Sequence, residues 1–416
     1  MIQAEALYCT FWLLACWRYL VLRLEVTSWW LRTPVWLRIC LQYYSILYAI
    51  FGFFIFSSLL TSRTYFDKYG LMDVSTFSLP EDAPALKLAL PHWMRALSLG
   101  TPLATLGTFV VTSWHIASHV MEVYRHTDGA LPAALQRDRV VQVLALPMVY
   151  GSMSFRSVIR MWSLFTGHAC RCAEHRGLSW EETEARVLGV YVANFQTADL
   201  YEAWALYQFA ELCLAKISDC LLCGGGQCVS DSPRRVKIGE EQQLLVRTVH
   251  RLTAQGVLAF VLVCFLNASY RLAFNVYRTV MAHLGKPEFS QDLDKYFLAM
   301  GLVASSEAIT NVITVERTFH RQLQDFRPTP KFWSTKILVS LAFIQEAVIG
   351  LCYHLSELQQ HLLYSSLICY EVFVLSLFHV YAWPADEKWL SQHPASAAGR
   401  PDGVELARVN LRFDGA

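Results

Sequence analysis

Eight apolar stretches run along this chain of 416 residues and constrain its fold more than any other feature. A helix needs about 20 mostly apolar residues to cross a bilayer, because its backbone polar groups must be satisfied within the helix itself. The stretches that meet this length are residues 39–60, 97–121, 140–165, 192–217, 252–274, 296–315, 334–353 and 362–383. They predict an all-α polytopic membrane protein.

Composition agrees with a bilayer as the solvent. Hydrophobic residues make up 54% of the chain and charged residues 17%, whereas soluble proteins contain about 45–50% and about 25%. The 35 Lys and Arg balance the 34 Asp and Glu, so there is no basic excess of the kind that nucleic-acid binding requires. The same composition excludes intrinsic disorder, which needs low hydrophobicity and a high net charge.

The first 38 residues are predicted to lie in the membrane interface. Arg18 and Arg23 interrupt an apolar run, and Trp alternates with Arg around Pro34, a mixture that favours the headgroup level. The alternative is that residues 7–24 form an additional span. The expected organisation is an interfacial segment (1–38), an additional transmembrane helix with a lumenal or extracellular linker (39–96), a seven-helix domain (97–383) and a cytosolic tail (384–416).

The distribution of basic residues predicts the orientation. With a cytosolic N-terminus, the segments on the cytosolic side contain 21 Lys and Arg, and those on the opposite side contain 10. Because cytosolic loops carry an excess of Lys and Arg, we expect eight spans with both termini in the cytosol. The only Asn-x-Ser/Thr site, at Asn267, falls inside a span and is not expected to be glycosylated.

From residue 97 onward, four groups of motifs resemble the organic solute transporter alpha-subunit and TMEM184 family. They occur in the family's order: Gln136-Arg137 with Pro147-Met148-Val149-Tyr150; Asp199-Leu200-Tyr201-Glu202-Ala203 with Leu206-Tyr207-Gln208-Phe209; Pro328-Thr329-Pro330-Lys331-Phe332 with Lys336 and Phe343-Ile344-Gln345; and Leu367-Ile368-Cys369-Tyr370-Glu371-Val372-Phe373 with His379 and Tyr381-Ala382.

The resemblance covers about three quarters of the chain and is that of a divergent member. Ala198 stands where the family has Arg, Gln208 where it has Asn, the fifth span lacks the family's Tyr-Asn pair, and residues 1–96 have no counterpart. The resemblance implies seven transmembrane helices and transport of bile acids, steroid conjugates or lipids. It also implies a separate single-span partner subunit, and residues 43–60 could supply such a helix in the same chain; a homo-oligomer is the other possibility.

Several predicted spans contain carboxylates, which are costly in a bilayer and normally face a bundle interior or a wet cavity. Asp199 and Glu202 share one helix face through their i,i+3 spacing. The alternatives for such residues are a solute pathway and an interhelical hydrogen-bond network. Lys336 and Arg271 could neutralise these acids. The alternative for Lys336 is that its side chain extends to the headgroups. The solute-pathway candidates are Asp199, Tyr201, Glu202, Tyr207, Gln208, Lys336, Gln345 and Glu371.

Four cysteines, Cys213, Cys220, Cys223 and Cys228, cluster near the cytosolic end of the fourth span. They are candidates for S-acylation (palmitoylation), as is common for juxtamembrane cysteines, and the resembled family has a cysteine-rich segment in this loop. Free thiols are the main alternative. A zinc site lacks a nearby fourth ligand.

No other motif predicts a metal, a cofactor or an enzyme. His115 and His119 lie one helical turn apart and could form one edge of a metal site, but an interfacial pair is the simpler interpretation. Residues 168–175 contain His and Cys without a known ligand spacing. There is no catalytic triad order and no phosphate-binding loop, and the motifs typical of G-protein-coupled receptors are absent.

Together these features predict a protein that moves amphipathic organic solutes down their gradients. Its expected partners are membrane lipids and the solute, with no nucleic acid, and it would reside in the plasma membrane or an endosomal or vacuolar membrane. The alternative is a non-transporting adaptor in endosome, vacuole or vesicle organisation.

The charge count generates a topological prediction. Single cysteines introduced in 61–96 or 166–191 should react with an impermeant maleimide from the lumenal or extracellular side, and those in 122–139 only after permeabilisation. Cytosolic reactivity of residues 166–191 would invert the topology.

Overall fold

The computed structural model describes residues 90–126, 131–166, 179–224, 294–318, 326–350 and 355–387, with residue 169 and short pieces within 56–63 and 248–277. These residues contain helices and no strand, which confirms the all-α prediction for this part of the chain. The helices are α6 (His92–Leu99), α7 (Thr101–His126), α8 (Leu131–Leu144), α9 (Leu146–Phe165), α11 (Trp180–Gly224), α13 (Asp294–Thr318), α15 (Pro328–Gly350) and α16 (Glu357–Ala382).

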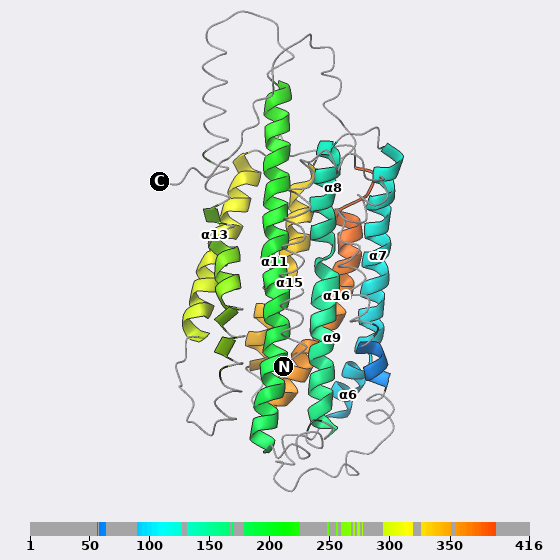
Figure 1. Cartoon of the computed structure of the whole chain (residues 1–416), viewed down its shortest axis with the longest axis vertical. Coiled ribbons are helices and arrows are strands. Elements are labelled where there is room, and N and C mark those ends of the chain that lie inside the picture. The colour runs from blue at the N-terminus through cyan, green and yellow to red at the C-terminus, as the bar shows by residue number, and fades with distance from the viewer. Residues whose placement is uncertain are drawn as a thin grey trace, which may run out of the picture.

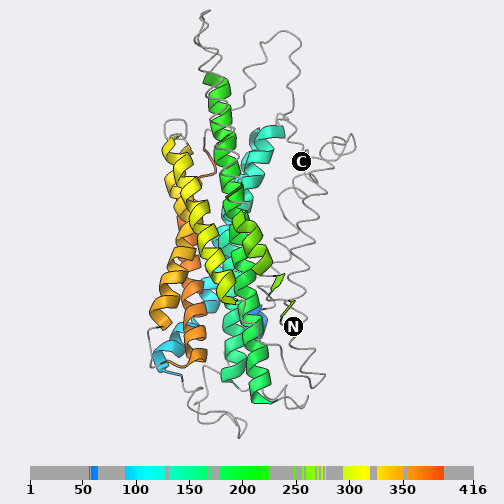
Figure 2. The same ribbon diagram turned by 90° about the vertical axis from the view of Figure 1, so that its left-hand side faces the viewer.

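The long helices run side by side along the long axis of an elongated bundle (Figures 1 and 2). α9 lies at its centre and packs against α16, α11 and α7. Every residue of α9 except Arg160 is buried, including Arg156 and four serines. A helix buried on all sides with polar side chains among its residues must satisfy those groups against its neighbours.

The ends of the helices follow local sequence signals. Gly100 separates α6 from α7, and α9 begins beside Pro147, whose missing N–H is tolerated in a first turn. α16 begins with a capping box, in which the Ser356 hydroxyl accepts from the Gln359 N–H and the Gln359 side chain accepts from the Ser356 N–H. α11 has 45 residues and extends beyond the predicted span 192–217 at both ends.

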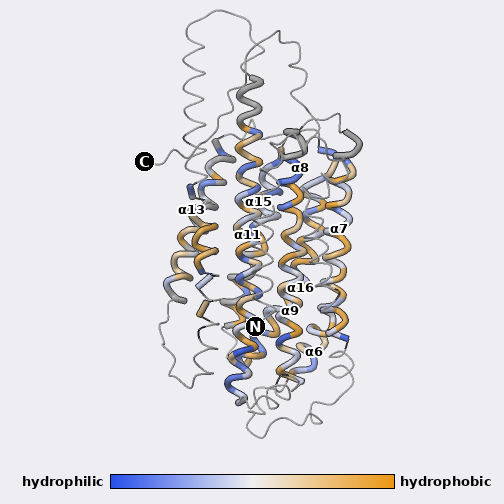
Figure 3. Tube along the Cα trace, viewed as in Figure 1, coloured by the Kyte–Doolittle hydropathy of each residue, from blue (hydrophilic) through white to orange (hydrophobic). Residues whose placement is uncertain are grey.

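The faces of α7 reverse the pattern of a helix in a water-soluble protein. Its buried face is polar, and its exposed face is apolar. The buried polar residues are Thr101, Thr105, Thr108, Thr112, His115 and His119, beside the apolar Ala104 and Ile116, and the large exposed residues are Leu103, Leu106, Val110, Trp114 and Met121. Apolar side chains are also exposed on α13, α15 and α16, and apolar residues extend along the middle of the bundle in Figure 3. An apolar exterior with polar side chains buried among the core residues is the arrangement expected of a bundle in lipid.

Two helical stretches in the described residues are long and apolar enough to cross a membrane: His92–Glu122 and Glu357–Ala382. The prediction of seven core spans is therefore not confirmed by length and composition alone. Buried polar residues explain the difference for α9, because Arg156, Arg160 and four serines lower its hydropathy. The interfacial segment 1–38 and most of the predicted span 39–60 lie outside the described residues.

α7 and α16 approach closely at Gly107. A Cβ atom at this position would lie 2.7 Å from Cε2 of Phe373 on α16, closer than carbon atoms can pack. Gly301 on α13 has no atom within 4 Å of its equivalent Cβ position, so it provides a matched glycine in a helix with free space.

We predict opposite outcomes for these two glycines. Gly107→Ala should lower the free energy of unfolding by about 1–3 kcal/mol through overpacking, whereas Gly301→Ala should raise it by up to about 1 kcal/mol, because alanine favours the helix. Thermal unfolding of both purified variants in the same detergent measures this. Equal stabilities for the two variants would contradict the close approach of α7 and α16.

Candidate functional site: a buried network on α9, α11 and α15

Asp199 and Glu202 project from α11 toward the same tyrosine of α9. The Tyr150 hydroxyl lies 2.6 Å from the Asp199 Oδ1 atom and 3.1 Å from the Glu202 Oε2 atom. The i,i+3 spacing places both acids on one helix face, as the sequence predicts. Tyr150 and Glu202 are buried, and Asp199 is half-buried.

The second oxygen of Glu202 pairs with a lysine from a distant part of the chain. The Lys336 Nζ atom of α15 donates to the Glu202 Oε1 atom at 3.2 Å, and the two side chains are 2% and 3% exposed. The Lys336 ammonium also lies 4.8 Å from the centre of the Phe260 ring, a cation–π contact. Lys336 therefore neutralises a buried acid and does not extend to the headgroups. Four residues, Tyr150, Asp199, Glu202 and Lys336, form what we call the acid–lysine network.

A buried ion pair of this kind is a weak source of stability. Removing two charges from water costs several kcal/mol for each ion, and their attraction offsets this only with good geometry and additional hydrogen bonds. Here Tyr150 supplies an additional hydrogen bond and Phe260 an aromatic face. Apolar residues could fill the same volume at lower cost, so the network is a reason to look for a function at this place.

Tyr201 and Trp204 of α11 point to a different helix. The Tyr201 hydroxyl donates to the Gln142 carbonyl of α8 at 2.8 Å, and the Trp204 indole N–H donates to the Gln142 side chain at 2.9 Å. The Gln142 amide in turn donates to Asp138 at 2.9 Å. These contacts fasten α11 to α8, and they do not bring Tyr201 into the acid–lysine network.

The remaining candidates are also distributed over the bundle. Tyr207 is half-buried, and its ring centre lies 5.7 Å from that of Trp204, while Gln208 is buried. Gln345 of α15 contacts Glu371 of α16, and this pair is separate from Glu202. One oxygen of each, Oε1 of Gln345 and Oε2 of Glu371, is buried without a hydrogen-bond partner. The structure thus brings five of the eight candidates into two groups: Asp199, Glu202 and Lys336 in the acid–lysine network, and Gln345 with Glu371.

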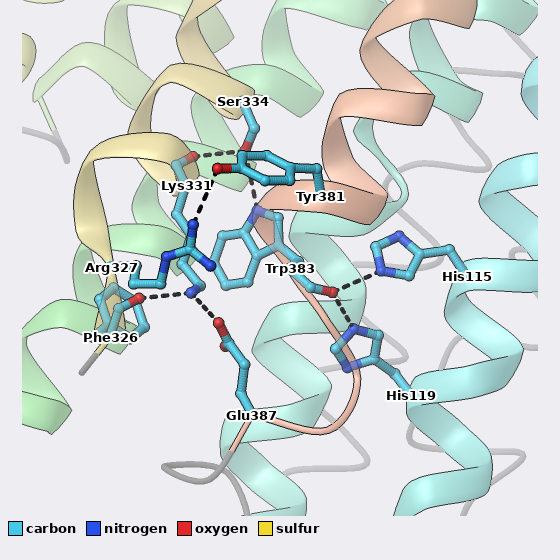
Figure 4. A network of polar contacts seen from close by, with 9 residues as sticks. All are labelled: His115, His119, Phe326, Arg327, Lys331, Ser334, Tyr381, Trp383 and Glu387. Atoms are coloured by element: carbon cyan, nitrogen blue, oxygen red, sulfur yellow. Dashed lines mark hydrogen bonds and ion pairs between the residues drawn. The ribbon is translucent and has the colours of Figure 1, made fainter.

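A second polar cluster surrounds the carbonyl that ends α16. His115 and His119 of α7 both place Nε2 near the Trp383 carbonyl oxygen, at 2.7 Å and 2.9 Å (Figure 4). The Trp383 indole N–H donates to the Ser334 hydroxyl at 3.0 Å, and His379 Nε2 lies 2.8 Å from the Ser334 carbonyl. The two α7 histidines are buried between helices at one end of the bundle; their position relative to the membrane interface stays a prediction. Their spacing serves to hold the end of α16.

Lys331 completes this cluster from the first turn of α15. Its ammonium donates to the Phe326 carbonyl at 2.6 Å and to Glu387 at 2.5 Å, and it lies 4.8 Å and 5.2 Å from the Phe326 and Trp383 ring centres. The side chain is fully buried. Arg137 of α8 donates to the nearby Ala385 carbonyl at 3.3 Å. These contacts bring together residues of the segments 122–139, 316–333 and 384–416 at one end of the bundle. The charge count assigns all three segments to the cytosolic side.

No group of three or more His, Cys, Asp or Glu side chains that could hold a metal occurs in the residues that the structure describes. Of the lipidation candidates, Cys213 is 4% exposed in the bundle core, out of reach of an acylating enzyme. Cys220 and Cys223 belong to the last turns of α11, and Cys228 lies outside the described residues.

Sequence reasoning missed two members of these clusters. Tyr150 carries the bridge between the two acids, and Lys331 is the most buried charge at the end of the bundle. Both occur in the motifs quoted above, but no spacing rule relates either residue to its partner. Arg271, the other cation considered for neutralising the acids, lies outside the described residues.

The Glu202–Lys336 pair generates a stability prediction. Lys336→Met should lower the free energy of unfolding by about 3–5 kcal/mol, because it leaves a buried carboxylate without its counter-ion. The Glu202→Leu, Lys336→Met double variant should recover most of the loss. A double-mutant cycle from chemical unfolding in detergent measures the coupling, and additive effects would show that the two residues do not interact.

Comparison with known families agrees with the motifs. Residues 190–388 match the family model of the organic solute transporter Ostalpha. Among the curated proteins and the solved structures compared with the chain, there is no match. The matched segment contains α11 from residue 190 onward, α13, α15 and α16, and hence Asp199, Glu202 and Lys336, whereas Tyr150 precedes it. Over residues 190–388 the chain is therefore similar to the organic solute transporter alpha family, which supports that part of the resemblance. The motifs at residues 136–150 and the likeness to TMEM184 lie outside the match and stay predictions.

Proposed function

We propose that this protein lets amphipathic organic anions move down their gradients across a membrane, along a route beside α9, α11 and α15. The observation that carries the proposal is the buried Glu202–Lys336 pair inside a transporter-family domain. Ionisable groups in the interior of a membrane bundle commonly mark substrate or ion pathways.

The network has the chemistry to recognise such a solute. The Lys336 ammonium can attract a carboxylate, sulfonate or sulfate, and the Tyr150 hydroxyl can donate a hydrogen bond. The surroundings are apolar and aromatic, with Phe260 against the lysine and Phe195 and Tyr364 in ring contact nearby on α11 and α16. An anionic group joined to a large apolar body, as in a conjugated bile acid, a steroid conjugate or a lipid, fits both parts.

The purely structural alternative predicts different energetics. Interhelical hydrogen bonds in membrane proteins contribute roughly 0.6 kcal/mol each on average, and the contacts of Tyr201 and Trp204 with Gln142 already hold α11 against its neighbours. A charged pair adds a desolvation cost that these neutral bonds do not have. This difference favours a functional role for Glu202 and Lys336.

The proposal includes the membrane arrangement expected from the sequence. The inverted faces of α7 and the two apolar helices support a membrane protein, and we propose that α9, α11, α13 and α15 cross the bilayer with them. The span 39–60 would then pack outside the seven-helix domain 97–383. We also propose that the eight solute-pathway candidates line the route of the solute. We also propose S-acylation at Cys220, Cys223 or Cys228, close to the end of α11.

Flux through purified protein tests the proposal. Proteoliposomes containing the wild-type protein should take up a radiolabelled taurine-conjugated bile acid faster than empty liposomes. Because Lys336→Met alone destabilises the fold, it is compared in the Glu202→Gln background. The Glu202→Gln, Lys336→Met variant should lose about 10–100-fold of the flux of Glu202→Gln, which corresponds to about 1.5–3 kcal/mol for a charge-assisted hydrogen bond.

Lys216→Met provides the matched control, because Lys216 is a half-exposed lysine of α11 outside the network. It should retain wild-type flux. Wild-type uptake equal to that of empty liposomes for bile-acid, steroid-conjugate and lipid probes would refute solute transport. Equal flux through the Glu202→Gln variant and the Glu202→Gln, Lys336→Met variant would show that the solute does not pass the acid–lysine network.

A further inference from the structure

Four aromatic rings meet at the end of the bundle where α16 ends. The centre of the Phe209 ring of α11 lies 6.2 Å from that of Phe326, 6.3 Å from that of Phe332 and 6.1 Å from that of Trp383. Phe209, Phe326 and Trp383 are 0% exposed, and Phe332 is 7% exposed. We call these four residues the aromatic plug. Because the rings have almost no exposed surface, water has no open path between them.

The aromatic plug lies next to the acid–lysine network. Along α11, Phe209 follows Glu202 by seven residues, which is close to two helical turns and about 10 Å on the same face. Along α15, Phe332 precedes Lys336 by four residues, about one turn. Each helix therefore carries a residue of the plug and a residue of the network on one face. A solute that leaves the network along these faces, toward the end of α16, meets the plug.

A buried ion pair fastens the plug to the segment that follows α16 (Figure 4). Lys331, one residue before Phe332, places its ammonium 4.8 Å and 5.2 Å from the ring centres of Phe326 and Trp383, and it donates to Glu387 at 2.5 Å. Aromatic rings pack without help from charges, and taking two charges out of water is costly. This cost is recovered when the pair separates and its charges are hydrated again. The pair therefore brings the free energies of a closed and an open plug closer together.

We propose that the aromatic plug is the gate of the solute route at this end of the bundle, and that the Lys331–Glu387 pair is its latch. The inference rests on the proposed function, which places the route at the acid–lysine network. The structure is closed at this gate. The gate opens when residues 383–387 carry Trp383 away from Phe209, and water then hydrates the two separated charges of the latch.

The segment 383–387 is the element of the gate that moves at the lowest cost. α16 ends at Ala382, so a shift of this segment breaks the hydrogen bond of the Trp383 N–H with the His379 carbonyl and the contacts of the second polar cluster, but no full turn of helix. A shift of Phe209 would displace α11 as a whole. Apolar constrictions in channels close by excluding water, and withdrawal of one ring admits it.

A native cysteine beside the network reports the opening of the gate. Cys264 follows Phe260, whose ring contacts the Lys336 ammonium, by one helical turn, and the charges of Glu202 and Lys336 act on its thiol. A small anionic methanethiosulfonate modifies thiols that water reaches, and its charge keeps it out of lipid. The modification rate of Cys264, followed by mass spectrometry of its peptide, therefore measures access to the network from water.

Two variants should open the gate in different ways. In purified protein in lipid nanodiscs, Phe209→Ala should raise the modification rate of Cys264 several-fold, because it removes the central ring of the plug. Glu387→Gln keeps all four rings and should also raise the rate several-fold, because it weakens the latch. The matched controls are Phe155→Ala, at a 0% exposed position of α9, and Glu211→Gln, in another ion pair of α11. Both controls should keep the wild-type rate.

The outcomes separate the gate from the proposed function. A Cys264 rate that neither Phe209→Ala nor Glu387→Gln changes would overturn the gate and leave solute transport standing. An equal increase in the two controls would also overturn it, because the reagent would then enter through general loosening of the bundle. An increase confined to the two gate variants, in a protein that moves none of the solute probes, would support control of access by the plug but refute the proposed function.

Discussion

The rest of the structure depends on how a bundle with an apolar exterior satisfies the charges in its interior. Glu202 and Lys336 come from helices separated by 134 positions in the chain, and each is at most 3% exposed. Neither side chain could be buried without the other, because an unpaired buried charge costs more than a bundle of marginal stability can offset. Their pairing therefore fixes α11 and α15 relative to each other, and Tyr150 extends the same constraint to the central helix α9.

The two polar clusters differ in kind. At the end of α16, the Trp383 carbonyl, Lys331 and Glu387 have hydrogen-bond or ion-pair partners drawn from α7, α15 and the segment after α16 (Figure 4). This cluster closes the end of the bundle, and Nδ1 of His119 and Nδ1 of His379 are buried in it without a hydrogen-bond partner. The acid–lysine network has two acids for one ammonium and one phenol proton for two acceptors. Its members come from α9, α11 and α15, so the network joins three helices in the interior of the bundle.

The sequence predicts much of the helical content and one part of the site. Spacing along α11 places Asp199 and Glu202 on one face, and both contact Tyr150. Spacing also places His115 beside His119, but it cannot reveal that both bind the Trp383 carbonyl, which belongs to the end of another helix. The pairing of Lys336 with Glu202, and of Glu371 with Gln345, depends on helix packing that periodicity within one segment does not report. By length and hydropathy, His92–Glu122 and Glu357–Ala382 are candidate spans, but polar residues buried in α9 lower the same signal there.

The central claim, that the acid–lysine network lies on the route of an organic anion, is tested most directly by covalent mapping. A taurine-conjugated bile acid carrying a diazirine is photolysed with the purified protein, and the labelled peptides are sequenced by mass spectrometry. The account predicts adducts in α9, α11 and α15 close to Tyr150, Glu202 and Lys336, and their loss when excess unlabelled probe competes. Adducts confined to the exposed apolar faces of α7 and α13, and unaffected by the competitor, would contradict it.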